Sequence, residues 1–434
     1  MIRWNSGPSR REFLAGLMAS AAGVIAGGAA PPATLRLGLD ARPATLALRP
    51  GQPPAAIFEL AAVSPGNSVR LRRDARVEVA LRNSLPVPVA PAWYGLDGAV
   101  APLLGSATAA GSTETSTLSM PHPGTLMADL RLFEAGLKLP IRPLPIVVEE
   151  SEPVAVDRDE LFLLEDWRLA PDGTVTVPGT AGEDLAPIFT VNGKLAPDFT
   201  LRANERLRLR FINGCQRAVV AVKIDGLEVM VMALDSQPAE PFSARNGAIV
   251  LAPGGRADVF LDGTMAPGSA TPILLHDGKA ARQVARLVGS AEPPVRPTRL
   301  TAPAPLPSNG LPANLDLKGA LRFDVALDGV GWTRPASFAP TAAPAFRAKA
   351  GRTVVLALKN TSPVTAVFHL HGHHFRLLDR LDDGWKPYWL DTLAVEPGQT
   401  QRIAFVATTQ GRWLIESVAT DWAAPRLVRW YAVE

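Results

Sequence analysis

The sequence predicts an all-β protein built from many short strands. Apolar or alternating runs recur along the chain, for example in residues 76–81, 207–212 and 353–358, and Gly, Asn or Pro lies close to each run. Long stretches with helical periodicity are scarce. Because short strands separated by turn residues are typical of β-sandwiches and β-barrels, we expect one of these architectures.

The strand pattern repeats, which predicts three related domains within the 434 residues. Asn83, Asn213 and Asn360 each follow a strand-like run inside a turn, and they lie 130 and 147 residues apart. Residues 290–312 are rich in proline and lack periodicity, which is typical of a semi-stiff linker. The predicted domains are residues 31–150, 151–292 and 310–434, with residues 293–309 as the linker.

Residues 1–30 have the features of an export signal. Arg10 and Arg11 precede a mildly apolar run that extends from Ala15 to Ala30 and ends in small residues. Adjacent arginines indicate the twin-arginine export route, so we expect a periplasmic protein. A membrane anchor is the alternative, but the run is short and weakly apolar for a bilayer span. We expect no membrane span in the mature chain.

Charge and cysteine content exclude several classes of function. The formal net charge is +3, and the signal supplies +2 of it (Arg3, Arg10 and Arg11 against Glu12), which leaves about +1. Such a weak charge offers no basic surface for nucleic acid. Cys215 is the only cysteine, which excludes an intramolecular disulfide and any multi-thiolate metal cluster. We interpret it as a small apolar filler.

A series of short motifs follows a characteristic order from about residue 49 to the end of the chain. They are residues 83–86, 92–96, 122–125 and 143–149 in the first predicted domain, 165–167, 191–193 and 253–259 in the second, and 369–375, 391–393, 397–399 and 411–413 in the third. Together they resemble the multicopper oxidases of the laccase and bilirubin-oxidase type. The resemblance implies three cupredoxin-like Greek-key domains of the β-sandwich or barrel kind.

Most positions that hold copper in that family carry other residues in this chain. The family uses one thiolate and two imidazoles for an electron-transfer copper, and eight imidazoles for a three-copper cluster that reduces oxygen. By resemblance, the histidine positions of the first motif hold Ala92 and Tyr94, and those of the second hold Asp129 and Arg131. Four cluster ligands are therefore replaced in these two motifs.

The third and fourth motifs show the same loss with one exception. Ala366 occupies an electron-transfer position, whereas His369 and His371 remain at two cluster positions. The fourth motif aligns with Glu416, Ser417, Val418, Trp422 and Leu427, so its thiolate and its histidines are replaced. The resemblance therefore implies two of eight cluster histidines, no electron-transfer copper and no route for electrons to a cluster.

His369 and His371 are the candidate site residues, and they allow two interpretations. They alternate on a predicted strand, so both should face the same side. A residual copper or zinc site would use them, with Asp129 and Glu416 as weaker oxygen donors. Alternatively, Arg131 repels a cation and pairs with Asp129 or Glu416. We favour this second interpretation and expect no cofactor, with copper or zinc at the histidine pair as the alternative.

An intact frame with replaced ligands predicts a protein without oxidase activity. It is similar in kind to the copper-free SufI (FtsP) proteins, which implies a periplasmic scaffold with a protein partner, connected with cell division or the envelope. One alternative is a copper-binding oxidoreductase, or a protein with a single metal, that uses His369 and His371. Another is a small-molecule binding protein with a pocket in the emptied cluster cavity.

Overall fold

The computed structural model describes residues 34–63, 68–99, 104–105, 107–133, 138–180, 185–327, 329–379 and 384–434. The predicted export signal, residues 1–30, lies outside this part of the chain. Thr34–Glu434 forms one compact unit, and its described residues form strands and short 3-10 helices but no α-helix. No helix among them is long and apolar enough to cross a membrane. The predicted all-β fold class is confirmed.

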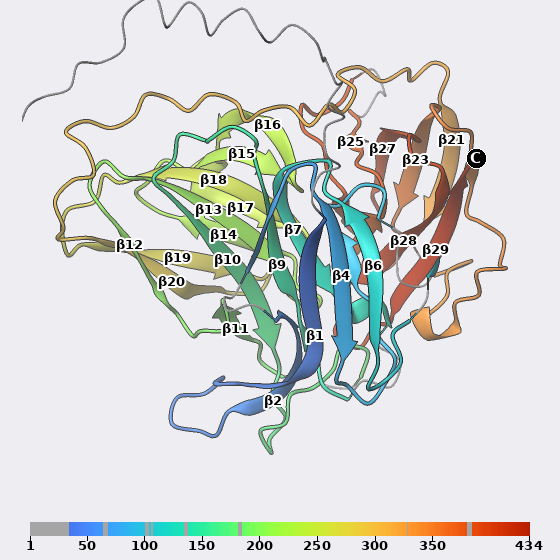
Figure 1. Ribbon diagram of the computed structural model, residues 1–434, viewed down its shortest axis with the longest axis horizontal. Helices are drawn as coiled ribbons and strands as arrows, with labels where there is room; N and C mark the ends of the chain where they lie inside the picture. Colours follow the sequence, from blue (N-terminus) through green and yellow to red (C-terminus); the bar gives the residue numbers. More distant parts are fainter. Residues whose placement is uncertain are drawn as a thin grey trace, which may run out of the picture. The chain divides into compact units, whose positions relative to one another are not determined.

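Six β-sheets follow one another as three pairs, and the first pair is formed by residues 35–149 (Figure 1). Its strands are β1 (Leu35–Leu46), β2 (Ala55–Ala62), β3 (Val69–Arg72), β4 (Arg76–Asn83), β5 (Ala92–Tyr94), β6 (Thr113–Ser119), β7 (Gly124–Asp129), β8 (Ile141–Arg142) and β9 (Leu144–Glu149), and the short helix η2 (Arg131–Phe133) follows β7. The two sheets have the strand orders β6-β4-β1-β2-β8 and β3-β9-β7-β5. β1 pairs in parallel with β4 and antiparallel with β2.

The second pair of sheets is formed by residues 158–289. Its strands are β10 (Arg158–Trp167), β11 (Ile188–Val191), β12 (Asp198–Leu201), β13 (Arg206–Asn213), β14 (Val220–Ile224), β15 (Met230–Leu234), β16 (Gln237–Ser243), β17 (Ala248–Leu251), β18 (Arg256–Asp262), β19 (Ala270–His276) and β20 (Ala281–Gly289), with helix η3 (Arg245–Gly247) before β17. The strand orders are β11-β10-β13-β18-β15-β16 and β12-β20-β19-β14-β17.

The third pair of sheets is formed by residues 321–433 and carries the two candidate histidines. Its strands are β21 (Leu321–Ala326), β22 (Arg347–Ala348), β23 (Thr353–Lys359), β24 (Ala366–Leu370), β25 (Arg376–Leu377), β26 (Thr392–Val395), β27 (Thr400–Val406), β28 (Gly411–Ala419) and β29 (Arg426–Val433), with helix η4 (Pro335–Ser337) before β22. The strand orders are β21-β23-β27-β25 and β22-β29-β28-β24-β26.

The three asparagine turns have the same hydrogen bonds, which explains why they recur. The side-chain amide of Asn83 donates to the carbonyls of Val87 and Thr108. Asn213 donates in the same way to Ala218 and Leu251, and Asn360 to Val364 and Val395. All three asparagines are fully buried. Each one therefore ties the turn that ends its strand to another segment of the same predicted domain, as expected for a repeated folding unit.

Each pair of sheets encloses its own apolar core, and a further cluster joins all three pairs. The cores contain Leu39 and Leu126 in the first pair, Phe162 and Phe211 in the second, and Phe368 and Phe405 in the third. The joining cluster contains Tyr94 and Met127 with Ile212, Leu414 and Trp430. It fixes β5 and β7 against β13, β28 and β29, and the candidate site lies beside it.

The proline-rich segment after β20 lies along the second pair of sheets. Asn204 donates from its side chain to the carbonyls of Arg296 and Pro297, and Arg206 donates to the carbonyl of Thr301. Leu306 is buried against a small cluster that contains Phe260. The segment is therefore anchored by hydrogen bonds along its length. The predicted domain boundaries stay a prediction, because Thr34–Glu434 forms one compact unit.

Candidate functional site

Four strands bring the predicted site residues together at the junction of the first and third pairs of sheets. Asp129, at the end of β7, lies opposite Ala92 of β5. Glu416 of β28 lies opposite His369 of β24. Tyr94 of β5 crosses the junction, because its hydroxyl donates to Glu416 Oε1 at 3.0 Å. The four candidate residues are buried, so their polar atoms need partners within the protein.

Glu416 is the centre of one buried hydrogen-bond group. Its Oε1 accepts from Tyr94 and lies 2.5 Å from His371 Nε2, and its Oε2 lies 2.5 Å from Arg426 Nη1. Burial raises the pKa of Glu416, but Arg426 and His371 outweigh burial, so the pKa lies well below its usual range. Burial raises the pKa of Tyr94 far above 10.0, and its hydroxyl remains a donor. Glu416 is therefore a carboxylate whose two oxygens are both occupied.

Asp129 belongs to a second buried ion pair, formed with Arg131. Arg131 Nε donates to Asp129 Oδ2, and the Arg131 backbone N–H donates to Oδ1 at 2.9 Å. Arg131 Nη1 also donates to the Cys215 carbonyl at 2.8 Å, which links the first pair of sheets to the second. Of the two partners predicted for Arg131, the structure selects Asp129. Sequence reasoning missed Arg426 as the partner of Glu416, although it lies immediately before Leu427 of the fourth motif.

His369, in β24, and His371, which directly follows this strand, face the same side, as their spacing predicts. Their ring centroids lie 4.6 Å apart, and the Tyr94 ring lies 4.5 Å from His369 and 5.5 Å from His371. His369 Nδ1 lies 2.7 Å from Thr392 Oγ1. Burial lowers the pKa of His369 to about 3, so this imidazole is neutral at physiological pH. Tyr94 and Thr392 therefore surround an uncharged ring.

The two neighbouring histidines contact other elements. His373 Nδ1 lies 2.8 Å from the Tyr431 hydroxyl, and burial lowers the pKa of His373 to about 4. His374 Nδ1 lies 2.8 Å from Asp97 Oδ1, and its Nε2 lies 2.8 Å from the Asp235 carbonyl. Burial lowers the pKa of His374, but Asp97 more than compensates and raises it to about 9. His374 is therefore a buried cation that bridges all three pairs of sheets.

Little space remains between the two ion pairs. A cavity lined by Tyr94, Arg131, His369, Glu416 and Arg426 has room for about 10 Å³ of solvent. A single water needs about 10–15 Å³, so the cavity holds at most one. Two guanidinium groups face this space and would repel a metal cation. Within the part of the chain that the structure describes, no group of three or more His, Cys, Asp or Glu side chains is arranged to hold a metal ion.

The position that resembles the electron-transfer site is also filled by packed side chains. Ala366, Ser417 and Trp422 are buried there. The guanidinium of Arg168, from the second pair of sheets, lies 4.4 Å above the centre of the Trp422 ring. Such a cation–π contact favours a fixed indole. Sequence reasoning did not identify Arg168, because it lies 254 residues before Trp422 and carries no local motif.

The paired sheets in their order, with a polar site between the first and third pairs, define a protein of three cupredoxin-like domains. Two multicopper oxidase family models match the chain, one over residues 153–269 and the other over residues 314–434. Together these ranges span more than half of the sequence. The chain belongs to the multicopper oxidase family.

Individual relatives agree with this assignment. The chain is 26% identical to the multicopper oxidase MmcO of Mycobacterium tuberculosis, with 94% of this chain and 93% of that protein covered. It is similar to the crystal structure of a multi-copper oxidase from Pseudomonas thermotolerans, with a TM-score of 0.78 and 25% identity over 93% of this chain and 100% of that chain. Lac15 from a marine microbial metagenome gives a TM-score of 0.74 and 24% identity, over 92% and 100% of the two chains.

These comparisons correct the expectation that the protein has no cofactor. The family models and the relatives point to copper. The expectation was wrong because it equated replaced ligands at single positions with loss of the metal, whereas the frame that matches throughout the chain is that of a copper family. Imidazole is a copper ligand, and His369 and His371 keep this chemistry. Their assignment as metal ligands, with Asp129 and Glu416, stays a prediction.

The side chains present do not fit a three-copper cluster. Such a cluster needs eight imidazoles, and only His369 and His371 stand at cluster positions. His371 Nε2 already contacts Glu416, and both carboxylates of the site are paired with arginine. A cluster would have to displace both guanidinium groups. These side chains can form buried ion pairs and connect the paired sheets, and they supply no step of oxygen reduction.

Proposed function

We propose that this protein is a non-oxidising member of the multicopper oxidase family that acts as a scaffold or interaction protein. The observation that carries the proposal is the pair of buried ion pairs, Asp129 with Arg131 and Glu416 with Arg426, at and beside former ligand positions. These charges satisfy one another. Both carboxylates of the site are therefore already paired with a guanidinium group.

The same contacts support a structural role for the site. Tyr94 and Glu416 connect β5 to β28 between the first and third pairs of sheets. Arg131 connects the first pair to the second through the Cys215 carbonyl. Hydrogen bonds to buried charged groups each contribute about 1.5–3 kcal/mol. In this proposal the site holds the domains in fixed positions, as a scaffold requires.

The test is an oxidase assay on the purified full chain after incubation with Cu(II) and removal of excess metal. We expect no oxidation of a phenol substrate and no intense visible band from a copper–thiolate bond, because the family's cysteine position holds Ser417. Bound metal is measured in the same sample. Stoichiometric copper together with phenol oxidation would overturn the proposal.

The second candidate is a copper-binding oxidoreductase or a protein with a single metal at His369 and His371. The family comparisons favour it, and so does the neutral state of His369, because a metal binds the unprotonated ring. One bound copper or zinc that is lost in His369→Ala and His371→Ala would support this candidate. A His276→Ala variant is the control, because His276 is exposed at the end of β19.

We also propose that the protein is exported to the periplasm by the twin-arginine route and serves a partner there, in cell division or the envelope. The motif at Arg10 and Arg11 supports this. Replacing both arginines with lysine should leave the chain in the cytoplasm, as cell fractionation would show. Loss of the gene should produce a division or envelope defect under stress, and a normal phenotype would contradict the division role.

A further inference from the structure

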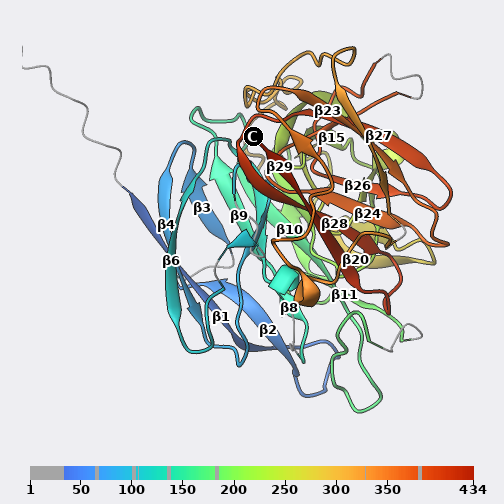
Figure 2. The same ribbon diagram turned by 90° about the vertical axis from the view of Figure 1, so that its right-hand side faces the viewer.

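One edge of the first pair of sheets is open. β6 is the last strand in the order β6-β4-β1-β2-β8, and Figure 2 shows it at the margin of the first-domain strands. Six of its seven residues are exposed, and Leu118 is half-buried. Edge strands are commonly protected by Pro, by charged side chains or by a bulge. β6 (TETSTLS) has no Pro and a single charged residue, Glu114, and its register with β4 is unbroken.

The hydrogen bonds beyond both ends of β6 show which backbone groups face outward. Met120 N–H donates to the Ala75 carbonyl, and Asn83 N–H donates to the Ser112 carbonyl. Hydrogen-bonded pairs alternate along an antiparallel ladder, so the even-numbered residues of β6 bond to β4. The N–H and C=O groups of Thr115 and Thr117 therefore point away from β4. An added strand could therefore form backbone hydrogen bonds with these two residues.

A pocket lies beside this edge. It has a volume of about 480 Å³, and its lining combines apolar residues with the carboxylate of Asp97 and the polar residues of β6. The apolar part contains Ala90, Pro91, Trp93, Leu96, Ala99, Leu118 and Pro121. Ser116 and Leu118 lie opposite the buried Val79 and Val77, so they face the inner side of the sheet. A residue added opposite Ser116 would face the same side and enter the pocket. The volume lies within the roughly 300–1,000 Å³ that is typical of binding pockets.

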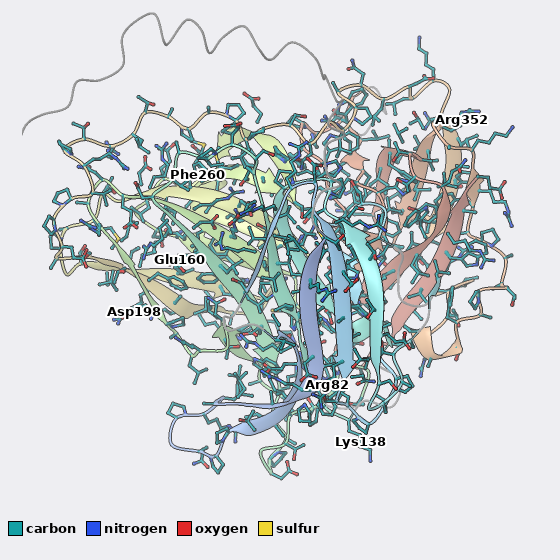
Figure 3. All side chains as sticks on the ribbon, viewed as in Figure 1. Arg82, Lys138, Glu160, Asp198, Phe260 and Arg352 are labelled. Carbon is teal, nitrogen blue, oxygen red and sulfur yellow. The ribbon has the colours of Figure 1, made fainter. Side chains whose placement is uncertain are left out.

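Glu114 gives this edge a charge. It lies opposite Leu81 on the same inner side as Ser116, it is exposed, and no salt bridge joins it to another residue in the described ranges. Arg82, labelled in Figure 3, lies opposite Thr113 and therefore faces the other side of the sheet. A basic residue on an added strand, opposite Glu114, would therefore meet an exposed carboxylate.

We propose that β6 and this pocket form a docking site for an extended segment of a partner protein. The segment adds antiparallel to β6, places a large apolar side chain in the pocket opposite Ser116, and places a basic residue two positions later opposite Glu114. Backbone hydrogen bonds supply affinity and the pocket supplies selectivity. This inference rests on the proposed interaction role and names the chemistry of the partner.

A second copy of the chain fits the edge less well. Antiparallel self-pairing centred on Ser116 would place Glu114 opposite Leu118, so no large apolar side chain would enter the pocket. A stable protein interface buries about 800 Å² per partner, which a seven-residue edge alone does not approach. A peptide with its own anchor residue uses both the edge and the pocket.

The test uses a defined probe, the fluorescein-labelled, amidated octapeptide Thr-Val-Thr-Trp-Thr-Lys-Thr-Val. In the proposed register its Trp lies opposite Ser116 and its Lys opposite Glu114. Fluorescence anisotropy with the full chain should show saturable binding, weaker for the reversed sequence. Thr117→Val keeps the outward N–H and should bind within twofold of the native chain. Thr117→Pro removes that N–H and should bind about tenfold more weakly.

Two further measurements keep the test decisive. Glu114→Gln should weaken the Lys peptide about threefold and leave a peptide with Gln in place of Lys unchanged. In the native chain, bound peptide should slow hydrogen exchange at the Thr115 and Thr117 amides, which does not depend on whether Thr117→Pro folds. Equal binding by the Thr117→Pro and Thr117→Val variants, or no saturable binding, would overturn the inference.

The remaining outcome is self-association. A dimer that sedimentation detects in the native chain and not in Thr117→Pro would assign the edge to a second copy and overturn the docking proposal. None of these results depends on the oxidase assay. Failure of the docking site and failure of the non-oxidising role are therefore distinguishable.

Discussion

Replacing Arg426 with methionine removes the cation that neutralises Glu416. Arg426 Nη1 lies 2.5 Å from Glu416 Oε2, and the two side chains are 5% and 1% exposed. Breaking a buried ion pair costs about 3–5 kcal/mol because the remaining charge stays buried. Tyr94 and His371 still contact the other carboxylate oxygen, so we expect a loss of about 3 kcal/mol at pH 7.

The pH dependence of this loss has a defined sign. The pKa of Glu416 in the folded protein lies below its usual value of 4.5, so its stabilising contribution is present above that value and is lost as the pH falls through the folded pKa. In Arg426→Met, burial acts without the guanidinium and raises the pKa of Glu416. The difference between the variant and the native protein should therefore shrink on acidification, because a protonated Glu416 needs no counter-charge.

Urea denaturation followed by tryptophan fluorescence, at pH 7 and at pH 5, measures both effects. Arg286→Met is the matched control, because Arg286 pairs with Asp198 at the surface, where the two side chains are 47% and 43% exposed. That variant should lose at most about 1 kcal/mol at either pH. If Arg426→Met costs no more than this control, or if its cost does not change with pH, the buried ion pair does not have the role assigned to it.

Three further changes test other parts of the fold. The pKa of His374 is about 9 in the folded protein against 6.5 ordinarily, so its contribution to the free energy of unfolding should be complete below pH 6.5 and lost as the pH rises through 9. The urea concentration at the midpoint of unfolding should therefore fall as the pH rises over this range, and it should fall less in Asp97→Asn. Asn213→Ala should cost about 2–3 kcal/mol in the same assay, because it removes hydrogen bonds to the partly buried carbonyl of Ala218 and the buried carbonyl of Leu251. Gly372→Ala should lower the thermal midpoint strongly, because its Cβ would lie 2.3 Å from the Trp413 ring, whereas Gly398→Ala, which has a similar positive φ and open space, should lower it only slightly.

The fold was predictable because its signals are local. Alternating apolar residues and turn residues lie next to one another in the sequence, and the structure places the predicted runs 76–81, 207–212 and 353–358 in β4, β13 and β23. The asparagine repeat was predictable for the same reason, since each side chain accepts a hydrogen bond from a backbone N–H two residues later. All the residues that specify such a strand or turn lie within a few positions of one another in the sequence.

The contact between Tyr94 and Glu416 was not predictable, because these residues come from distant strands. Tyr94 and Glu416 are 322 residues apart, and nothing near either residue specifies the other. Arg131 had two candidate carboxylates, and it pairs with Asp129, which lies only two residues before it. The family motifs located the site, but they describe where copper ligands would stand. They say nothing about side chains that pair with the residues now in those places.

The two ion pairs bring positive charge to the region where the family holds its metal cations. In the family, neutral imidazoles surround metal cations, so the positive charge belongs to the metal. In this protein the guanidinium groups of Arg131 and Arg426 bring positive charge to the same region, and Asp129 and Glu416 neutralise it. Cation and counter-ion are both part of the chain, so these ion pairs contribute to the packing between the paired sheets. Returning one histidine, as in Asp129→His, should therefore destabilise the protein rather than restore a ligand, because Arg131 would lose its buried counter-ion.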